Sequence, residues 1–146
     1  MHDTAQSATM KRWLYLLPAI IYMGVIFWMS CHPAPESLRK FPIWGEIKAV
    51  HLIEYGMLAL LWVWGLQNAT QWIWRKAALY SVSITFLWGI SDEIHQAFVP
   101  GRSAKVSDAL TDLLAALLVI GGLAIIRGMR GKLCYKSDFK QDEEAP

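Results

Sequence analysis

The sequence predicts an all-α, polytopic membrane protein with four transmembrane helices and both termini in the cytoplasm. Of the 146 residues, 55% are hydrophobic and only 18% are charged, which is more apolar than a soluble domain of this size. Long stretches without charge alternate with short polar segments, as in a chain that crosses a bilayer repeatedly. These stretches are expected to be helices, because a helix in lipid satisfies its own backbone hydrogen bonds.

The composition excludes several other classes of protein. With ten Gly, six Pro and two Cys, the chain is not a disordered tail, a collagen-like repeat or a Cys-rich secreted scaffold. The formal net charge is only +2 and the basic residues are scattered, so we expect no nucleic-acid partner. The length allows a single domain.

Four segments are expected to cross the membrane. The first covers residues 13–31 and contains no charge, and the second covers 49–74 with one carboxylate. The third begins at residue 77 and is short unless it continues through polar residues to about 98, so we predict that it does. The fourth covers residues 108–127. The predicted organisation is a cytoplasmic N-terminus (1–12), a four-helix membrane domain (13–127) and a cytoplasmic tail (128–146).

The distribution of Lys and Arg gives the orientation, because cytoplasmic segments carry more of them. One side would hold the larger set: Lys11, Arg12, Arg75, Lys76, Arg127, Arg130, Lys132, Lys136 and Lys140. The other side would hold Arg39, Lys40, Lys48, Arg102 and Lys105. Both termini are therefore predicted to be cytoplasmic.

Ionisable residues inside the predicted helices are the main functional signal, because they are costly in a membrane. They recur three or four residues apart, a spacing that places them on one helix face. The groups are His51, Glu54 and Tyr55; Asp92, Glu93, His95 and Gln96; and Asp108, Thr111 and Asp112. In the predicted topology all three groups lie in one layer near the outer surface. Arg102 and Lys105 follow directly above it.

Two stretches of the chain resemble the VanZ-like membrane proteins. They are KAVHLIEYGMLALL (48–61) and SDEIHQAFVPGRSAKVSDALTDLLAALL (91–118). The matching residues are Lys48, His51, Tyr55, Asp92, Glu93, His95, Gln96, Pro100, Gly101, Arg102, Ser107 and Asp108. The chain departs from the pattern at Asp112 and Ala115, where the family usually has Asn and Gly.

The resemblance implies a multi-pass protein of the bacterial cytoplasmic (inner) membrane and cell envelope. The family is named for low-level resistance to the glycopeptide antibiotic teicoplanin, and the resemblance implies no settled activity. A membrane protein has membrane lipids as expected partners, and a protein partner stays open. The chemistry therefore has to be inferred from the residues.

We expect the polar layer to bind the headgroup of a phospholipid or of a lipid-linked cell-wall precursor. Arg102 and Lys105 would hold a phosphate, because both side chains recognise this group. The remaining ligand-binding candidates are Lys48, His51, Glu54, Tyr55, Gln96, Asp108 and Asp112. Ser107 is expected to cap the last helix.

Three alternatives stay open. The layer is an enzyme site if His95 acts as general acid or base with Asp92 or Glu93 orienting it. It is a metal site if the pairs at i, i+3, His51 with Glu54 and Asp92 with His95, converge, with Asp108 or Asp112 adding oxygen ligands. This spacing is common by chance, so we assign neither a metal ligand nor a cofactor from the sequence. It is purely structural if the polar groups only hold the helices together, in a protein that acts as a partner within an envelope complex.

Overall fold

The structure is a computed structural model that describes residues 11–32, 48–100, 102 and 104–143, with backbone alone for Lys48 and 131–143. Its elements are helical: a short 3₁₀ turn η1 (Leu14–Leu16), α2 (Leu17–Ser30), α5 (Lys48–Thr70), α6 (Trp74–Gln96) and α7 (Val106–Glu143). No strand occurs in the described ranges, and the predicted all-α class is confirmed.

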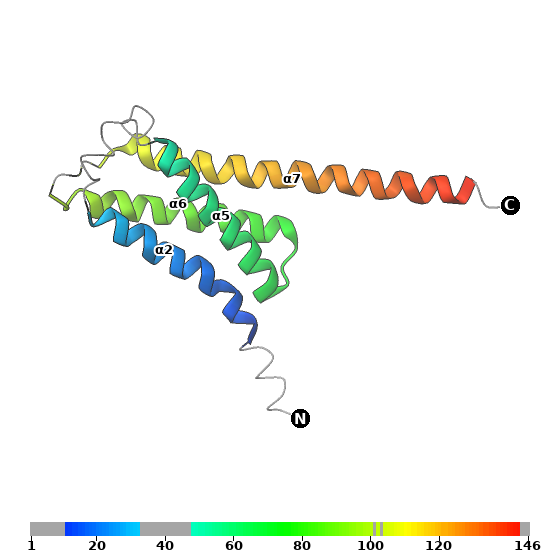
Figure 1. Cartoon of the computed structure of the whole chain (residues 1–146), viewed down its shortest axis with the longest axis horizontal. Helices are drawn as coiled ribbons and strands as arrows, with labels where there is room; N and C mark the ends of the chain where they lie inside the picture. The colour runs from blue at the N-terminus through cyan, green and yellow to red at the C-terminus, as the bar shows by residue number, and fades with distance from the viewer. Residues whose placement is uncertain (1–10, 33–47, 101, 103, 144–146) are drawn as a thin grey trace, which may run out of the picture.

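Three helices pack against one another and a fourth covers part of them. α5, α6 and α7 are in mutual contact, and α2 lies against α5 and α6. The helices converge at the end where α2 and α6 finish and where α5 and α7 begin (Figure 1). α7 runs far beyond the other helices and continues to Glu143, so residue 127 is not a helix end.

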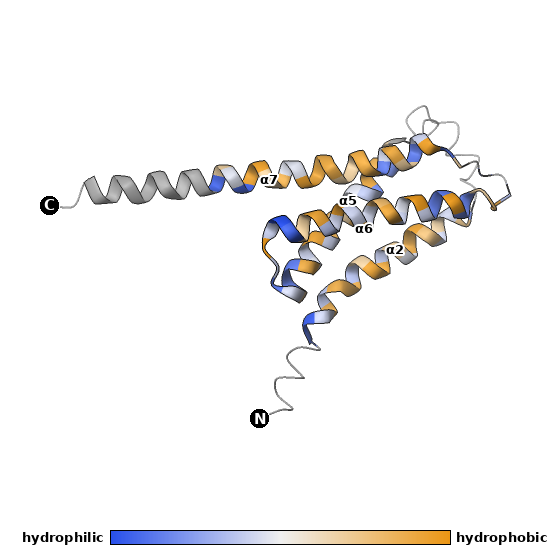
Figure 2. Cartoon of the chain, turned by 180° about the vertical axis from the view of Figure 1, so that it is seen from behind, coloured by the Kyte–Doolittle hydropathy of each residue, from blue (hydrophilic) through white to orange (hydrophobic). Residues whose placement is uncertain are grey.

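Three helices are long and apolar enough to cross a membrane. They cover Lys11–Ser30, Ala49–Thr70 and Val106–Arg130. α6 has the same length as α5, but its composition does not qualify. The reason is visible in Figure 2, where polar residues mark both ends of α6. Of the four predicted spans, three are therefore supported by length and composition, and α6 by length alone.

Small residues let the helices approach closely in the core, as is common in membrane bundles. Ala59, Ala77 and Ala116 are fully buried, and the Ser81 hydroxyl donates a hydrogen bond of 2.7 Å to the Ala59 carbonyl. Gly65 has no room for a side chain, because a Cβ there would lie 2.7 Å from the Tyr15 carbonyl oxygen. Large apolar side chains are exposed on the outside, among them Ile21, Ile53, Leu87 and Leu118. This surface suits contact with lipid.

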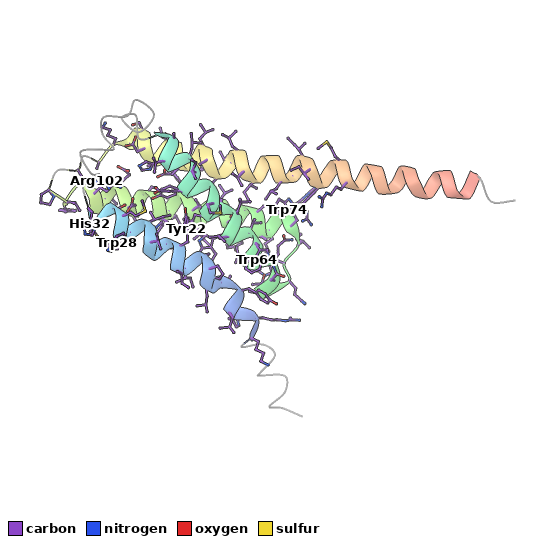
Figure 3. The ribbon with its side chains drawn as sticks, in the orientation of Figure 1. Tyr22, Trp28, His32, Trp64, Trp74 and Arg102 are labelled. Carbon is purple, nitrogen blue, oxygen red and sulfur yellow. The ribbon has the colours of Figure 1, made fainter. Side chains whose placement is uncertain are left out.

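The end of the bundle opposite the helix convergence is basic and aromatic. The Lys76 ammonium lies 4.2 Å from the centre of the Trp72 ring, and the Arg127 guanidinium lies 4.7 Å from the Trp74 ring. Figure 3 shows Trp74 at this end and Arg102 at the other. Trp beside Lys or Arg is typical of a membrane interface.

Candidate functional site

Seven buried polar side chains gather where α2 and α6 end and where α5 and α7 begin. We call them the polar cluster, and its members are Ser30, His51, Tyr55, Asp92, Glu93, Gln96 and Asp112. Each is at most 7% exposed. The structure thus brings together residues that the sequence placed in one layer, and it adds Ser30 from α2.

Asp92 joins three helices through one carboxylate oxygen. Its Oδ2 accepts hydrogen bonds from Ser30 Oγ at 2.7 Å, Gln96 Nε2 at 2.7 Å and Tyr55 OH at 3.3 Å. α2, α5 and α6 each supply one donor. The other oxygen, Oδ1, is buried and has no hydrogen-bond partner among the described residues.

His51 and Asp112 connect the first turn of α5 to the second turn of α7. His51 Nδ1 lies 2.9 Å from Asp112 Oδ1, and the imidazole stacks on the Tyr55 ring at a centroid distance of 5.9 Å. A carboxylate accepts hydrogen bonds, so the proton is assigned to Nδ1 and the lone pair of a neutral ring to Nε2. Asp112 is fully buried, and its Oδ2 has no partner in the described part of the chain.

The segment between α6 and α7 positions Glu93. The backbone N–H of Lys105 donates a hydrogen bond of 2.8 Å to Glu93 Oε2, while the buried Oε1 has no partner among described atoms. Ser107 was expected to cap α7, but the helix begins one residue earlier, at Val106. The Ser107 hydroxyl instead donates to Asp108 Oδ1 at 3.0 Å.

One group in this region has the composition of a metal site. Ligand atoms of His51, Glu93 and Asp108 all lie within 4.8 Å of one another. Asp108 is half-buried, and the other two are buried. Glu54 is half-buried on α5, and Lys48 begins this helix with its side chain outside the described atoms.

His95 has different neighbours from those expected of a general acid or base held by Asp92 or Glu93. Its Nε2 lies 3.4 Å from Cys31 Sγ, and its ring lies 4.5 Å from the Phe27 ring. Both neighbours come from the α2 region. His95 therefore sits at the edge of the polar cluster, against α2.

Arg102 binds backbone oxygens at the end of α2. Its Nε and Nη2 donate to the His32 carbonyl at 3.2 and 2.7 Å, and Nη2 also donates to the Met29 carbonyl at 3.0 Å. Figure 3 shows Arg102 beside His32. Basic side chains commonly satisfy the free carbonyls at a helix C-terminus. The side chain of Lys105, in contrast, is exposed.

Two residues outside the predicted set, Ser30 and Gly89, also shape the cluster. Ser30 carries a hydroxyl at the end of an apolar helix. Its position on the predicted outer side is a feature of the sequence that could have identified it as part of the cluster. Gly89 gives no such signal. A Cβ at this position would lie 2.7 Å from Asp112 Oδ2 and 3.3 Å from Tyr55 Cε1, so only glycine leaves room for the Asp112 carboxylate.

The charge of the cluster is uncompensated within the described residues. Asp92, Glu93 and Asp112 are buried carboxylates, and His51 is the only basic side chain of the described set paired with one of them. A buried carboxylate is costly unless it is protonated or has a cationic partner. The site is therefore suited to a ligand that brings positive charge or hydrogen-bond donors.

Comparison with known proteins gives one match. The family model described as VanZ/LLP1 matches residues 13–127, a range that includes every residue of the polar cluster. Searches of curated proteins and of solved structures found no match. Because the matched range covers most of the sequence, the chain belongs to the VanZ/LLP1 family.

Proposed function

We propose that this chain is a multi-pass protein of the bacterial cytoplasmic membrane whose polar cluster faces outwards and binds the headgroup of an envelope lipid or lipid-linked cell-wall precursor. Both termini lie in the cytoplasm in this proposal. The basic residues Lys11, Arg75, Lys76 and Arg127 then lie on the cytoplasmic side, as the distribution of positive charge in membrane proteins requires.

The pairing of the helix ends supports four crossings. The hydrogen bond between His51 and Asp112 joins the first turn of α5 to the second turn of α7, so both helices begin at the same end. α6 connects the end of α5 to the start of α7 and has to return over the same distance. Its acidic residues Asp92 and Glu93 are buried against neighbouring helices, which explains how a helix of this composition avoids exposing charge to lipid.

The observation that carries the proposal is a set of buried carboxylate oxygens that have no hydrogen-bond partner among the residues that the structure describes. They are Asp92 Oδ1, Glu93 Oε1 and Asp112 Oδ2. Buried acceptors are normally satisfied, and hydroxyl or ammonium groups of a lipid headgroup are donors that would satisfy them. The exposed Lys105 would supply a charge for the phosphate of the same molecule.

Lipid binding is testable with phosphatidylglycerol, which carries both a phosphate and hydroxyl donors. The protein is purified in mild detergent, and bound lipid is counted by native mass spectrometry during titration. We expect Lys105→Ala and Glu93→Gln to weaken binding at least several-fold. The first removes the charge proposed for the phosphate, and the second replaces a carboxylate acceptor of a hydroxyl donor by an amide, which accepts a weaker hydrogen bond. Lys76→Ala is the matched control, since it removes a basic side chain from the opposite end.

Equal lipid binding by all four proteins would contradict the proposal. It would favour the structural alternative, in which the polar groups only hold the helices together. A specific observation supports that alternative, because Asp92 already accepts hydrogen bonds from α2, α5 and α6. A role in glycopeptide resistance would follow only if a lipid-linked cell-wall precursor competed with phosphatidylglycerol for the same site.

A further inference from the structure

We infer that His51, Glu93 and Asp108 form a binding site for one divalent transition-metal ion at the outer end of the bundle. The three side chains come from α5, α6 and the first turn of α7, and their ligand atoms lie within 4.8 Å of one another. Ligands around Zn²⁺ are about 3–4 Å apart. Side-chain rotations that move each atom by about 1 Å would therefore complete the site.

An unpartnered buried oxygen points to a ligand at this position. Glu93 is only 7% exposed, and its Oε1 has no hydrogen-bond partner in the described part of the structure. The neighbouring Asp112 is also buried, so the region concentrates negative charge. A divalent cation would offset this charge. Among the described residues, no Lys or Arg nitrogen lies within 4.0 Å of these carboxylate oxygens to do so.

Groups around the three ligands would hold them in place. Asp112 Oδ1 accepts from His51 Nδ1 at 2.9 Å, which leaves Nε2 of the neutral ring free to bind a metal. The Lys105 backbone N–H fixes Glu93 through Oε2, and the Ser107 hydroxyl fixes Asp108 through Oδ1. A carboxylate behind a ligating histidine is the usual outer shell of a zinc site.

The ligand types select the metal. One imidazole and two carboxylates suit Zn²⁺ or Mn²⁺, whereas Mg²⁺ and Ca²⁺ take oxygen ligands. Three protein ligands also leave a coordination position open for water or for an oxygen of another molecule. The spacing of the sequence suggested different pairs, His51 with Glu54 and Asp92 with His95, but the structure places Glu93 and Asp108 beside His51.

The test is metal binding by the full chain without a polyhistidine tag. The protein is stripped with a chelator in detergent without added lipid, and Zn²⁺ or Mn²⁺ bound after dialysis is counted by elemental mass spectrometry. We expect about one ion per chain. His51→Ala, Glu93→Gln and Asp108→Asn should each weaken binding at least tenfold, and Asp112→Asn by about 10–100-fold, because it removes the charge behind the ligand.

His32→Ala is the matched control, because it removes an exposed histidine from the same end of the bundle. It should bind the ion like the unaltered chain. Co²⁺ substitution adds a second readout, since loss of the imidazole changes its visible absorption. Circular dichroism identifies variants that are unfolded, and the half-buried Asp108→Asn is expected to tolerate substitution best.

Two results would overturn the inference: no Zn²⁺ or Mn²⁺ bound to the unaltered chain, or equal binding by the His51 and Glu93 variants and the His32 control. The inference goes beyond lipid binding and does not depend on it. Metal bound without any effect of Lys105→Ala on phosphatidylglycerol would refute the lipid proposal alone. Lipid binding that persists in the presence of a chelator, in a chain that binds no metal, would refute the metal site alone.

Discussion

Asp112 is one of the two positions at which this chain departs from the VanZ-like pattern noted above, and it is a fully buried carboxylate. It accepts a hydrogen bond from His51 at 2.9 Å. An Asn side chain would present an amide oxygen to the same donor, but without the charge that makes such a bond stronger. The substitution of Asp for Asn therefore makes His51 a better acceptor at its second nitrogen.

Gly89 provides the space for this carboxylate, so we predict that Gly89→Ala disturbs it. The added Cβ would lie 2.7 Å from Asp112 Oδ2, and the carboxylate has to move away from His51. We expect a loss of stability of about 1–3 kcal/mol from overpacking. Zn²⁺ affinity should fall at least several-fold.

Thermal unfolding in detergent and Zn²⁺ titration measure the two effects. Gly121→Ala is the control, because a Cβ there meets no atom within 4 Å. If Gly89→Ala and Gly121→Ala behave alike in both measurements, Gly89 does not support the site as proposed.

At the scale of elements, α2 is held to the bundle at its end by polar contacts. Ser30 donates to Asp92, and Arg102 donates to the carbonyls of Met29 and His32. The remaining surface of α2 is largely exposed apolar side chains. The polar contacts therefore decide where the end of α2 lies, whereas a lipid-facing helix gains little from hydrophobic contact alone.

Arg102→Ala is predicted to loosen the end of α2. Loss of a hydrogen bond worth about 1 kcal/mol would raise the open population about fivefold. Cys31 reports this opening, because it is half-buried with its Sγ 3.4 Å from His95 Nε2. Its rate of reaction with a maleimide, measured in a Cys134→Ser background, should rise by about the same factor.

Lys105→Ala is the control for this measurement, since its exposed side chain makes no hydrogen bond to described atoms of α2. Arg102→Lys should restore the rate only in part, because Lys lacks the fork that reaches two carbonyls. An unchanged rate in Arg102→Ala would show that α2 is held by other contacts.

At the scale of the whole molecule, the polar cluster and the basic, aromatic end lie at opposite ends of the bundle. In the proposed topology the end with Arg75 and Lys76 faces the cytoplasm, because it carries more positive charge. α7 would then extend beyond the membrane on that side, because it continues past Arg130 to Glu143.

The predicted topology is tested in intact cells. A fluorescent protein fused to the C-terminus should fluoresce, since it folds in the cytoplasm. In a background in which Cys31→Ser and Cys134→Ser remove the native thiols, a cysteine in place of Ala104, an exposed residue beside the polar cluster, should react with a maleimide that cannot cross the membrane. A cysteine in place of Ile73, exposed between α5 and α6, is the control and should not react.

Labelling at Ile73 but not at Ala104 would mean that the orientation in the membrane is opposite to the predicted one. Labelling of both positions, or of neither, would mean that α6 does not span the membrane, because residues 73 and 104 lie at its two ends and would then share one side. A C-terminal fusion that stays dark while only Ala104 is labelled would mean that α7 does not cross.

The sequence determined the class of protein, the helices and the set of polar residues, because hydropathy and the spacing of three or four residues are local properties. It did not locate the start of α7 at Val106, nor its continuation to Glu143. It also gave no means of deciding whether His95 or His51 occupies the centre of the site.

Only the tertiary structure decided which groups meet. Asp92 pairs with Ser30, Tyr55 and Gln96, and Arg102 binds the end of α2 instead of standing free for a phosphate. These pairings depend on the rotation and depth of each helix relative to the next. Packing at small residues such as Gly89 fixes both quantities, and contacts between residues so distant in the sequence leave no periodic signal within a single helix.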